Sequence, residues 1–405
     1  MQFSKHIQIF LYSFLFFGFL FLSAELNTIV QFGIILTLML YNVSVDRYLL
    51  KLLSPLILIL LLGILSFLGK GNDGYVLLKD IWYFSRPIVC LLCGYLIIKD
   101  YKIFMRVLIL FGIISALSHF IIIVINYPLI IDFKLNVFRN LTGSSSFIEV
   151  LSLFLLLFHK EFRIGKITIS RNLILVILFL SLVLYFSRTT LVTSLIIYFI
   201  LKGYHQMKLK NLFIWVALIM IIIVSTLMIG SSDSQQGSFT HKVKKSLTEI
   251  TMSSGFDTNK EKIEYWRAYE AFLAISQYWS KNNYIRLTGK GFGSTVDLMK
   301  EYNLGDSKMR FIPHIHNGFV NTLFKVGVIG ILVYFLFLYY LLAISKNKFN
   351  IMNNKAVYIQ RLIFAFGIYY IFSSLVIGGI YNQGEYSLFF LGAFIKIYIN
   401  QQEYA

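Results

Sequence analysis

The chain has 405 residues, of which 58% are hydrophobic and only 14% are charged, whereas soluble domains carry roughly 25% charged residues. No soluble core of this length could bury so much apolar surface, so the composition excludes a soluble globular protein. The formal net charge of +18 would fit nucleic-acid binding, but the positions of the basic residues, described below, speak against that class.

Apolar runs near the ~20 residues that cross a hydrocarbon core recur along most of the chain. In chain order they cover 7–22, 29–41, 52–68, 81–98, 107–125, 147–158, 173–186, 191–201, 212–229, 319–342, 362–377 and 386–399. They predict an all-α polytopic membrane protein with about twelve transmembrane helices. The first run resembles a signal peptide, but Leu22 fits the small-residue position of a cleavage site poorly, so an uncleaved first helix is predicted.

The basic residues follow the positive-inside rule. With the N-terminus in the cytoplasm, roughly 18 Lys and Arg residues fall on the cytoplasmic side, against about 6 in the short outer loops. Much of the positive charge therefore reflects membrane topology, and no nucleic-acid partner is predicted. Both termini are expected in the cytoplasm and the longest loop on the opposite, periplasmic side.

The two cysteines, Cys90 and Cys93, form a CxxC pattern inside an apolar run. We interpret them as small packed side chains and not as a redox or metal pair, because the pattern lies within a helix-forming stretch. Two cysteines also cannot form a disulfide framework.

The segment 231–318 is the main polar interruption of the chain. It divides the sequence into a first set of helices (1–230), a large periplasmic loop (231–318) and a last set of helices (319–405). Within the loop, Thr258 and Glu261 have the spacing of a capping box. The following stretch, 262–278, has the periodicity of an amphipathic helix, which could lie on the membrane, over a cavity, or against the helix bundle.

Two short motifs close the loop. The sequence GKGFGS at 289–294 could bring backbone amides close to a phosphate, or could be a turn after a strand-like piece at 284–287. His314 and His316 form an HxH pattern, for which the sequence offers no third metal ligand nearby. A proton acceptor or hydrogen-bond donor is the favoured role, and a solvated turn is the alternative.

Cations recur where the predicted outer loops lie. Arg188, in a short turn between two apolar runs, is a functional candidate because an unpaired arginine between such helices is costly. The other outer cations are Lys70, Lys79, Arg86 and Arg139. Glu149, an unusual residue for a lipid-facing helix, either pairs with one of the arginines or contributes to a site. Together these residues predict an anionic, lipid-linked substrate.

Four motifs combine into a recognisable pattern: FSRTT at 186–190, KIEYWRAYEAF at 262–272, GKGFGS at 289–294 and HNGFVNTLFKVGVIG at 316–330. This combination resembles the O-antigen ligase and polymerase superfamily. The most specific element is His316-Asn317 followed, after nine residues, by G-x-x-G at Gly327 and Gly330.

The resemblance implies a GT-C-like, inverting glycosyltransferase of the bacterial inner membrane that needs no metal or other cofactor. Such enzymes move a glycan from undecaprenyl diphosphate to an acceptor hydroxyl. By position, Arg188 would bind the diphosphate and His316 would orient or deprotonate the acceptor, with His314 and Asn317 beside it. Either Lys262 or Arg267 would be the loop cation, and Lys70 or Lys79 a second basic contact.

Several functions remain open on these residues. A surface-polysaccharide polymerase, making O-antigen or capsule, is favoured over a ligase that transfers the glycan to lipid A-core; a polymerase normally acts with a separate chain-length co-polymerase. A transporter or flippase is disfavoured because internal repeats and mid-membrane charges are not evident. A sensor would leave the outer arginines and His316 without a role.

Overall fold

The computed structural model describes residues 5–40, 45–68, 70–126, 146–158, 170–185, 187–204, 256, 258–304, 307–344, 354–382 and 384–403. The predicted run 212–229, the first part of the predicted loop and Arg139 lie outside these residues. Within them the molecule is almost entirely helical, which confirms the predicted all-α class apart from one small hairpin.

Every other predicted apolar run coincides with a helix. These helices are α1 (Lys5–Phe21), α2 (Ala24–Met39), α3 (Arg47–Phe67), α4 (Gly74–Ile97), α5 (Tyr101–Ile125), α8 (Ser146–Phe158), α9 (Arg171–Leu184), α10 (Arg188–Leu201), α16 (Gly318–Ala343), α17 (Asn354–Val376) and α18 (Ser387–Glu403). Among them, four have the length and apolar character to cross a membrane: α3, α5, α16 and the Ala356–Val376 part of α17. The helices α1, α2, α8, α9 and α10 are apolar but shorter. The structure therefore has the apolar helices of a membrane protein, while the number of spans stays a prediction.

Aspartates start three consecutive helices. Asp46, Asp73 and Asp100 are the N-cap residues of α3, α4 and α5, and each side chain accepts a hydrogen bond from a backbone N–H in the first turn. A carboxylate at this position satisfies an otherwise unpaired donor and interacts favourably with the positive end of the helix dipole. These polar residues therefore fix where the apolar helices begin.

The helices pack in pairs from distant parts of the sequence. Helix α18 packs against α4, α16 against both α3 and α17, and α10 against α17. Large apolar side chains such as Phe10, Leu61, Val124 and Phe179 stay exposed on the outside. Such exposed apolar surface is costly in water and suits lipid contact.

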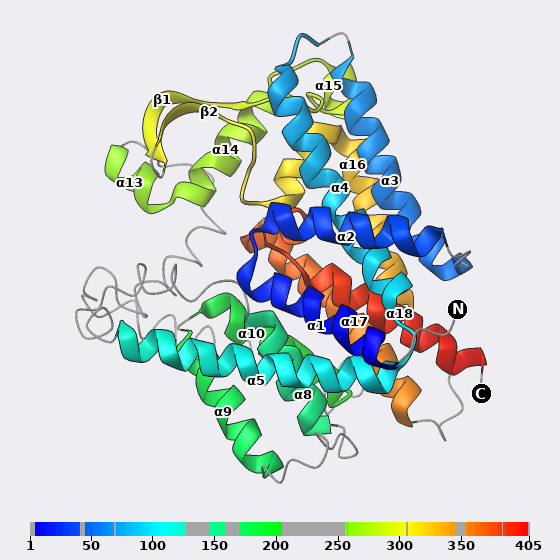
Figure 1. Ribbon diagram of the computed structural model, residues 1–405. Helices are drawn as coiled ribbons and strands as arrows, with labels where there is room; N and C mark the ends of the chain where they lie inside the picture. Colours follow the sequence, from blue (N-terminus) through cyan, green and yellow to red (C-terminus); the bar gives the residue numbers. More distant parts are fainter. Residues whose placement is uncertain are drawn as a thin grey trace.

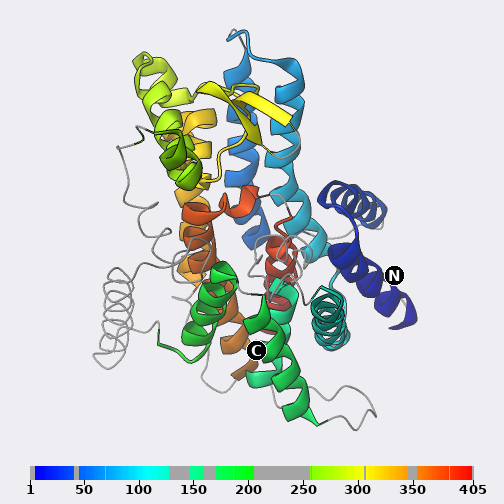
Figure 2. The same cartoon turned by 90° about the vertical axis from the view of Figure 1, so that its left-hand side faces the viewer.

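The helices do not share one direction. Helices α2 and α5 run across Figure 1 and are seen nearly end-on in Figure 2, whereas α3 and α4 are seen lengthwise in both views. The described helices thus form a group around α3, α4 and α16, crossed steeply by α2 and α5.

The described part of the polar loop is helical at first, as predicted. The capping box is present, with Thr258 accepting from the Glu261 N–H and the Glu261 side chain accepting from the Thr258 N–H. The predicted single helix is divided at Tyr265 into α13 (Asn259–Glu264) and α14 (Trp266–Trp279). Helix α14 packs against α16 and the hairpin, which confirms the interpretation as a helix lying on the bundle.

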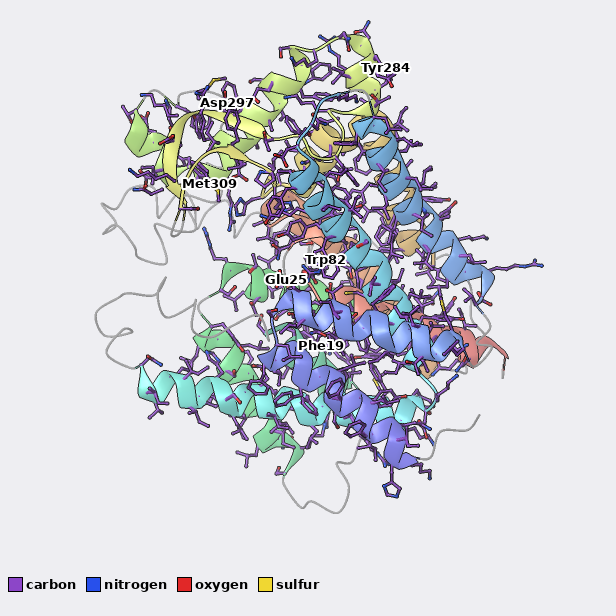
Figure 3. All side chains as sticks on the ribbon, turned by 45° about the horizontal axis from the view of Figure 1, so that its top comes forward. Phe19, Glu25, Trp82, Tyr284, Asp297 and Met309 are labelled. Atoms are coloured by element: carbon purple, nitrogen blue, oxygen red, sulfur yellow. The ribbon has the colours of Figure 1, made fainter. Side chains whose placement is uncertain are left out.

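The prediction of a strand-like piece at 284–287 is wrong. Residues Asn283–Thr288 form the short helix α15, which the Asn282 side chain caps by accepting from the Ile285 N–H. The strands follow instead, as an antiparallel pair of β1 (Val296–Leu304) and β2 (Ser307–Ile312). Asp297 and Met309 mark the two strands in Figure 3, and Tyr284 marks α15.

The glycine-rich segment 289–294 is packed between α3 and α16 and is not an open phosphate loop. We call this segment the glycine wedge. Its backbone N–H groups at Lys290 and Gly291 donate to the carbonyls of Phe324 and Lys325, at 2.8 and 3.0 Å. These carbonyls are released because α16 is interrupted at Gly327, whose φ is 74°. On the other side the Phe292 ring is fully buried, and its N–H donates to the Gly63 carbonyl of α3.

The first glycine of the G-x-x-G element therefore has a structural reason, and we expect Gly327→Ala to destabilise the protein by about 1–3 kcal/mol. A Cβ at this left-handed position would lie 2.3 Å from the Leu287 carbonyl oxygen. Gly33→Ala is the control, because nothing lies within 4 Å of its added Cβ. The midpoint of thermal unfolding in detergent should fall for the first variant only; equal midpoints would refute the wedge.

Candidate functional site

His316 lies where the polar segment meets α16, held by a buried carboxylate. Its backbone N–H donates to Glu270 Oε1 at 2.5 Å, and its Nδ1 lies 2.8 Å from the same oxygen. The Glu270 side chain is 1% exposed, whereas that of His316 is 49% exposed. A hydrogen bond from Nδ1 to this carboxylate requires the tautomer with its proton on Nδ1, in which Nε2 is the basic nitrogen.

This arrangement suits proton transfer. A carboxylate on Nδ1 fixes the tautomer and the ring orientation, and stabilises the imidazolium that forms when Nε2 accepts a proton. Glu270 comes from α14 and His316 from the residues before α16, so the packing of the amphipathic helix creates the pair. Glu270 is therefore the partner that the predicted role of His316 as a proton acceptor requires.

The end of α17 gathers more of the predicted residues. Asn317 caps α16, accepting from the Val320 N–H at 3.0 Å, and its amide donates to the Leu375 carbonyl at 3.4 Å. Arg267 Nη1 donates to the next carbonyl, Val376 O, at 3.1 Å. Arg267 and Asn317 thus meet at the last turn of α17, whereas the Lys262 ammonium lies over the Tyr269 ring at 5.7 Å.

His314 lies next to this turn and is kept neutral. Its ring centroid is 5.9 Å from that of Tyr83 on α4. Burial lowers the pKa of His314 to about 4, and the positive charges of His316 and Lys325 act in the same direction. A neutral imidazole can donate and accept hydrogen bonds but adds no charge to the site.

The depressed pKa of His314 predicts acid sensitivity. Between about pH 6.5, the ordinary value of histidine, and about pH 4, the unfolded chain binds a proton that the folded protein does not. The free energy of unfolding should therefore fall as the pH is lowered through this range. His314→Asn should flatten the fall in the thermal midpoint between pH 7 and pH 4.5, relative to wild type; an unchanged slope would contradict the assignment.

The three predicted outer cations Lys70, Lys79 and Arg86, which the structure describes, are each engaged by their own neighbours. Lys70 donates to the Gly289 carbonyl at 2.7 Å and lies over the Tyr284 ring, and burial lowers its pKa. Lys79 lies over the Tyr75 ring, 4.9 Å from the centroid. Arg86 is 4% exposed and donates to Thr28 Oγ1 on α2. Lys70 thus supports the glycine wedge, and a role of these cations in substrate binding stays a prediction.

Glu149 is fully buried between α5, α8 and α9. In the part of the chain that the structure describes, its carboxylate accepts hydrogen bonds from the hydroxyls of Ser115, Ser181 and Tyr185 at 2.6 to 2.7 Å. Its partners among the described residues are hydroxyl groups, and a salt bridge with an arginine stays a prediction. Glu149 therefore joins helices, and a role in binding substrate stays untested.

Arg188 is the first residue of α10, with Ser187 as the N-cap. Directly after it, Thr189, Thr190 and Thr193 line a cavity of about 160 Å³. Other lining residues come from α17 and from the connection that follows it, which includes the short helix η2 (Gly379–Tyr381). This connection begins at Ile377, next to the carbonyl that Arg267 binds, so it links the surroundings of Arg188 to those of His316.

Sequence reasoning missed a second buried carboxylate in this cavity. Glu385 lines it, accepting from the Tyr369 hydroxyl at 2.8 Å and from the Ser387 N–H at 3.1 Å. Burial raises its pKa, which the hydrogen bonds from Ser387 and Tyr369 oppose. The signal was available, because Glu385 is the only charged residue between Arg361 and Lys396.

A buried ion pair was missed as well. Lys325 Nζ on α16 lies 2.6 Å from Asp80 Oδ2 on α4, with side chains 1% and 4% exposed. The Gly293 N–H also donates to Asp80, and Lys325 also donates to the Ser294 carbonyl. The pair therefore fastens the glycine wedge to both helices.

Metal ligands do not gather in the described residues, where no group of three or more His, Cys, Asp or Glu side chains could hold an ion. Cys90 and Cys93 are free and buried in α4, as expected of packed small side chains. Metal independence of any reaction stays a prediction.

The helices and the site define a mostly helical membrane protein with a histidine–carboxylate pair beside a polar segment. Residues 173–335 match the family model described as O-Antigen ligase. The matched range contains Arg188, Arg267, His316 and the G-x-x-G glycines, so the resemblance to the O-antigen ligase and polymerase superfamily is confirmed. No curated protein matches the chain.

Proposed function

We propose that this protein is a glycosyltransferase that polymerises bacterial surface polysaccharide, O-antigen or capsule, from undecaprenyl-diphosphate-linked repeat units at the periplasmic face of the inner membrane. The observation that carries the proposal is the His316–Glu270 pair inside the region that matches the family. The apolar helices supply the membrane setting, and the proposed topology has about twelve spans with cytoplasmic termini and a periplasmic polar segment.

In the proposed reaction, an acceptor hydroxyl attacks the anomeric carbon of the donor sugar as the bond to the diphosphate oxygen breaks, with inversion. His316 Nε2 takes the hydroxyl proton, and Glu270 stabilises the resulting imidazolium. Arg188, with Arg267 or Lys262, neutralises the charge that develops on undecaprenyl diphosphate, so no metal or cofactor is needed. Arg267 is the better-placed loop cation, because it reaches the same α17 turn as Asn317.

A ligase is the second candidate, favoured by the description of the matching family model as O-Antigen ligase. The chemistry at the donor would be the same, and only the acceptor would differ: lipid A-core in place of a second repeat unit. A polymerase would act with a chain-length co-polymerase.

The glycan profile of a deletion strain separates these functions. Loss of a polymerase should leave single repeat units on the lipid core, and complementation with the wild-type gene should restore the ladder. Bare core with accumulated lipid-linked polymer would identify the ligase. An unchanged profile would refute both and return the transporter as the explanation.

A further inference from the structure

The cavity beside Arg188 has the chemistry of a carbohydrate site. Its lining includes polar residues: the threonines of α10, Asn382 and Glu385. The same lining includes aromatic residues, among them Phe147, Tyr369 and Phe390. Sugars combine hydroxyl groups with apolar ring faces, and a site that offers both acceptors and aromatic surface matches that pattern.

Glu385 has acceptor capacity to spare. A carboxylate has about four acceptor positions, and the described residues supply three donors to it: the Tyr369 hydroxyl, the Ser387 N–H and the Ser387 hydroxyl. These contacts hold the carboxylate in place, and Glu385 is one of the residues that line the cavity. Its buried position makes a hydrogen bond from a ligand hydroxyl stronger than one made in water.

The volume limits the ligand. A cavity of about 160 Å³ is close to the ~150 Å³ of a protein cavity that holds one benzene ring. It can therefore receive one ring, with substituents toward its open side, but not an oligosaccharide. The buried Glu385 carboxylate in its lining suits the hydroxyl groups of a sugar and not the apolar polyprenyl chain.

We propose that this cavity is a subsite for a single sugar residue of the lipid-linked substrate, with Glu385 accepting hydrogen bonds from its hydroxyl groups. The assignment rests on the proposed function for the identity of the lipid carrier. It adds a specificity-determining carboxylate from the α17–α18 connection, a part of the chain that lies outside the matched range 173–335. Glu385 is a binding residue here, and the proton transfer is left to His316.

Two variants change the subsite in different ways. Glu385→Gln keeps the size of the side chain and exchanges one acceptor oxygen for a donor group. Thr193→Leu adds apolar volume where Thr193 lines the cavity. Glu25→Gln is the matched control for charge, and Thr37→Leu for the second variant, because Thr37 is exposed and, like Thr193, donates to the carbonyl four residues earlier.

The test is direct binding to purified protein in nanodiscs of two probes: the lipid-linked repeat unit extracted from the deletion strain, and undecaprenyl diphosphate without sugar. Wild type and both controls should bind the lipid-linked repeat unit at least tenfold more tightly than undecaprenyl diphosphate. Glu385→Gln and Thr193→Leu should lose this preference, by a factor on the order of 10–100 for the carboxylate, while binding undecaprenyl diphosphate as wild type does. Retained preference in both variants, or none in wild type, would overturn the subsite.

The same preparations separate this inference from the proposed function. If wild type polymerises the repeat unit and both variants keep the sugar preference, the subsite is wrong and the function stands. If the wild-type protein transfers no glycan but prefers the glycosylated probe, and the Glu385→Gln variant lacks this preference, the subsite stands and the proposed function is wrong.

Discussion

His316→Ala is expected to lower the rate of glycan transfer by a factor of about 10²–10⁴, the usual contribution of a positioned general base. The side chain is half-exposed and its described contact is to Glu270, so the fold should survive the change. Glu270→Gln should reduce the maximal rate as well, by removing the group that orients the ring.

The two effects should not add, because both variants disable one unit. A His316→Ala/Glu270→Gln double variant should therefore be no slower than His316→Ala alone. His6→Ala is the control, since His6 is an exposed histidine on α1. The rates are measured with reconstituted protein at equal amounts. A His316→Ala rate above a tenth of wild type would remove the histidine from the chemistry.

The second large effect concerns stability. Asp80→Leu or Lys325→Met alone should cost about 3–5 kcal/mol, because each leaves an unpaired charge buried between α4 and α16. Each change also leaves a backbone partner unsatisfied, the Gly293 N–H or the Ser294 carbonyl. The midpoint of thermal unfolding in detergent reports the loss.

The double variant Asp80→Leu/Lys325→Met should recover part of the loss, since no buried charge remains. Arg310→Met is the matched control, because it breaks the exposed pair of Arg310 with Asp297 on the hairpin, and such pairs contribute little. If the single variants have the same midpoint of thermal unfolding as the control, the Asp80–Lys325 pair does not stabilise the packing of segment 289–294 against α4 and α16.

The sequence predicted what depends on local pattern. Hydropathy placed the apolar runs on helices wherever the structure describes them, and Thr258–Glu261 predicted the start of α13 through a contact that spans three residues. The pairing of Lys325 with Asp80 links residues 245 positions apart, and no periodicity encodes it. The function of GKGFGS as a wedge follows only from the break of α16 at Gly327.

Some residues of the candidate site could likewise be predicted from the sequence, and others could not. His316 could be singled out because histidine at the end of a polar segment is chemically informative, whereas its partner Glu270 looked like one more polar residue of an amphipathic helix. The structure shows that Glu270 faces inward, at 1% exposure. Glu385 was missed although the argument used for Arg188, a lone charge among apolar runs, applies to it equally.

The most direct test of the account is transfer by the purified protein in liposomes, given only the lipid-linked repeat unit and excess EDTA. Each new linkage should release one undecaprenyl diphosphate as the glycan lengthens, and neither Arg188→Ala nor His316→Ala should support this release. A wild-type protein that releases no undecaprenyl diphosphate with either a second repeat unit or lipid A-core as acceptor would contradict the assignment as a glycosyltransferase.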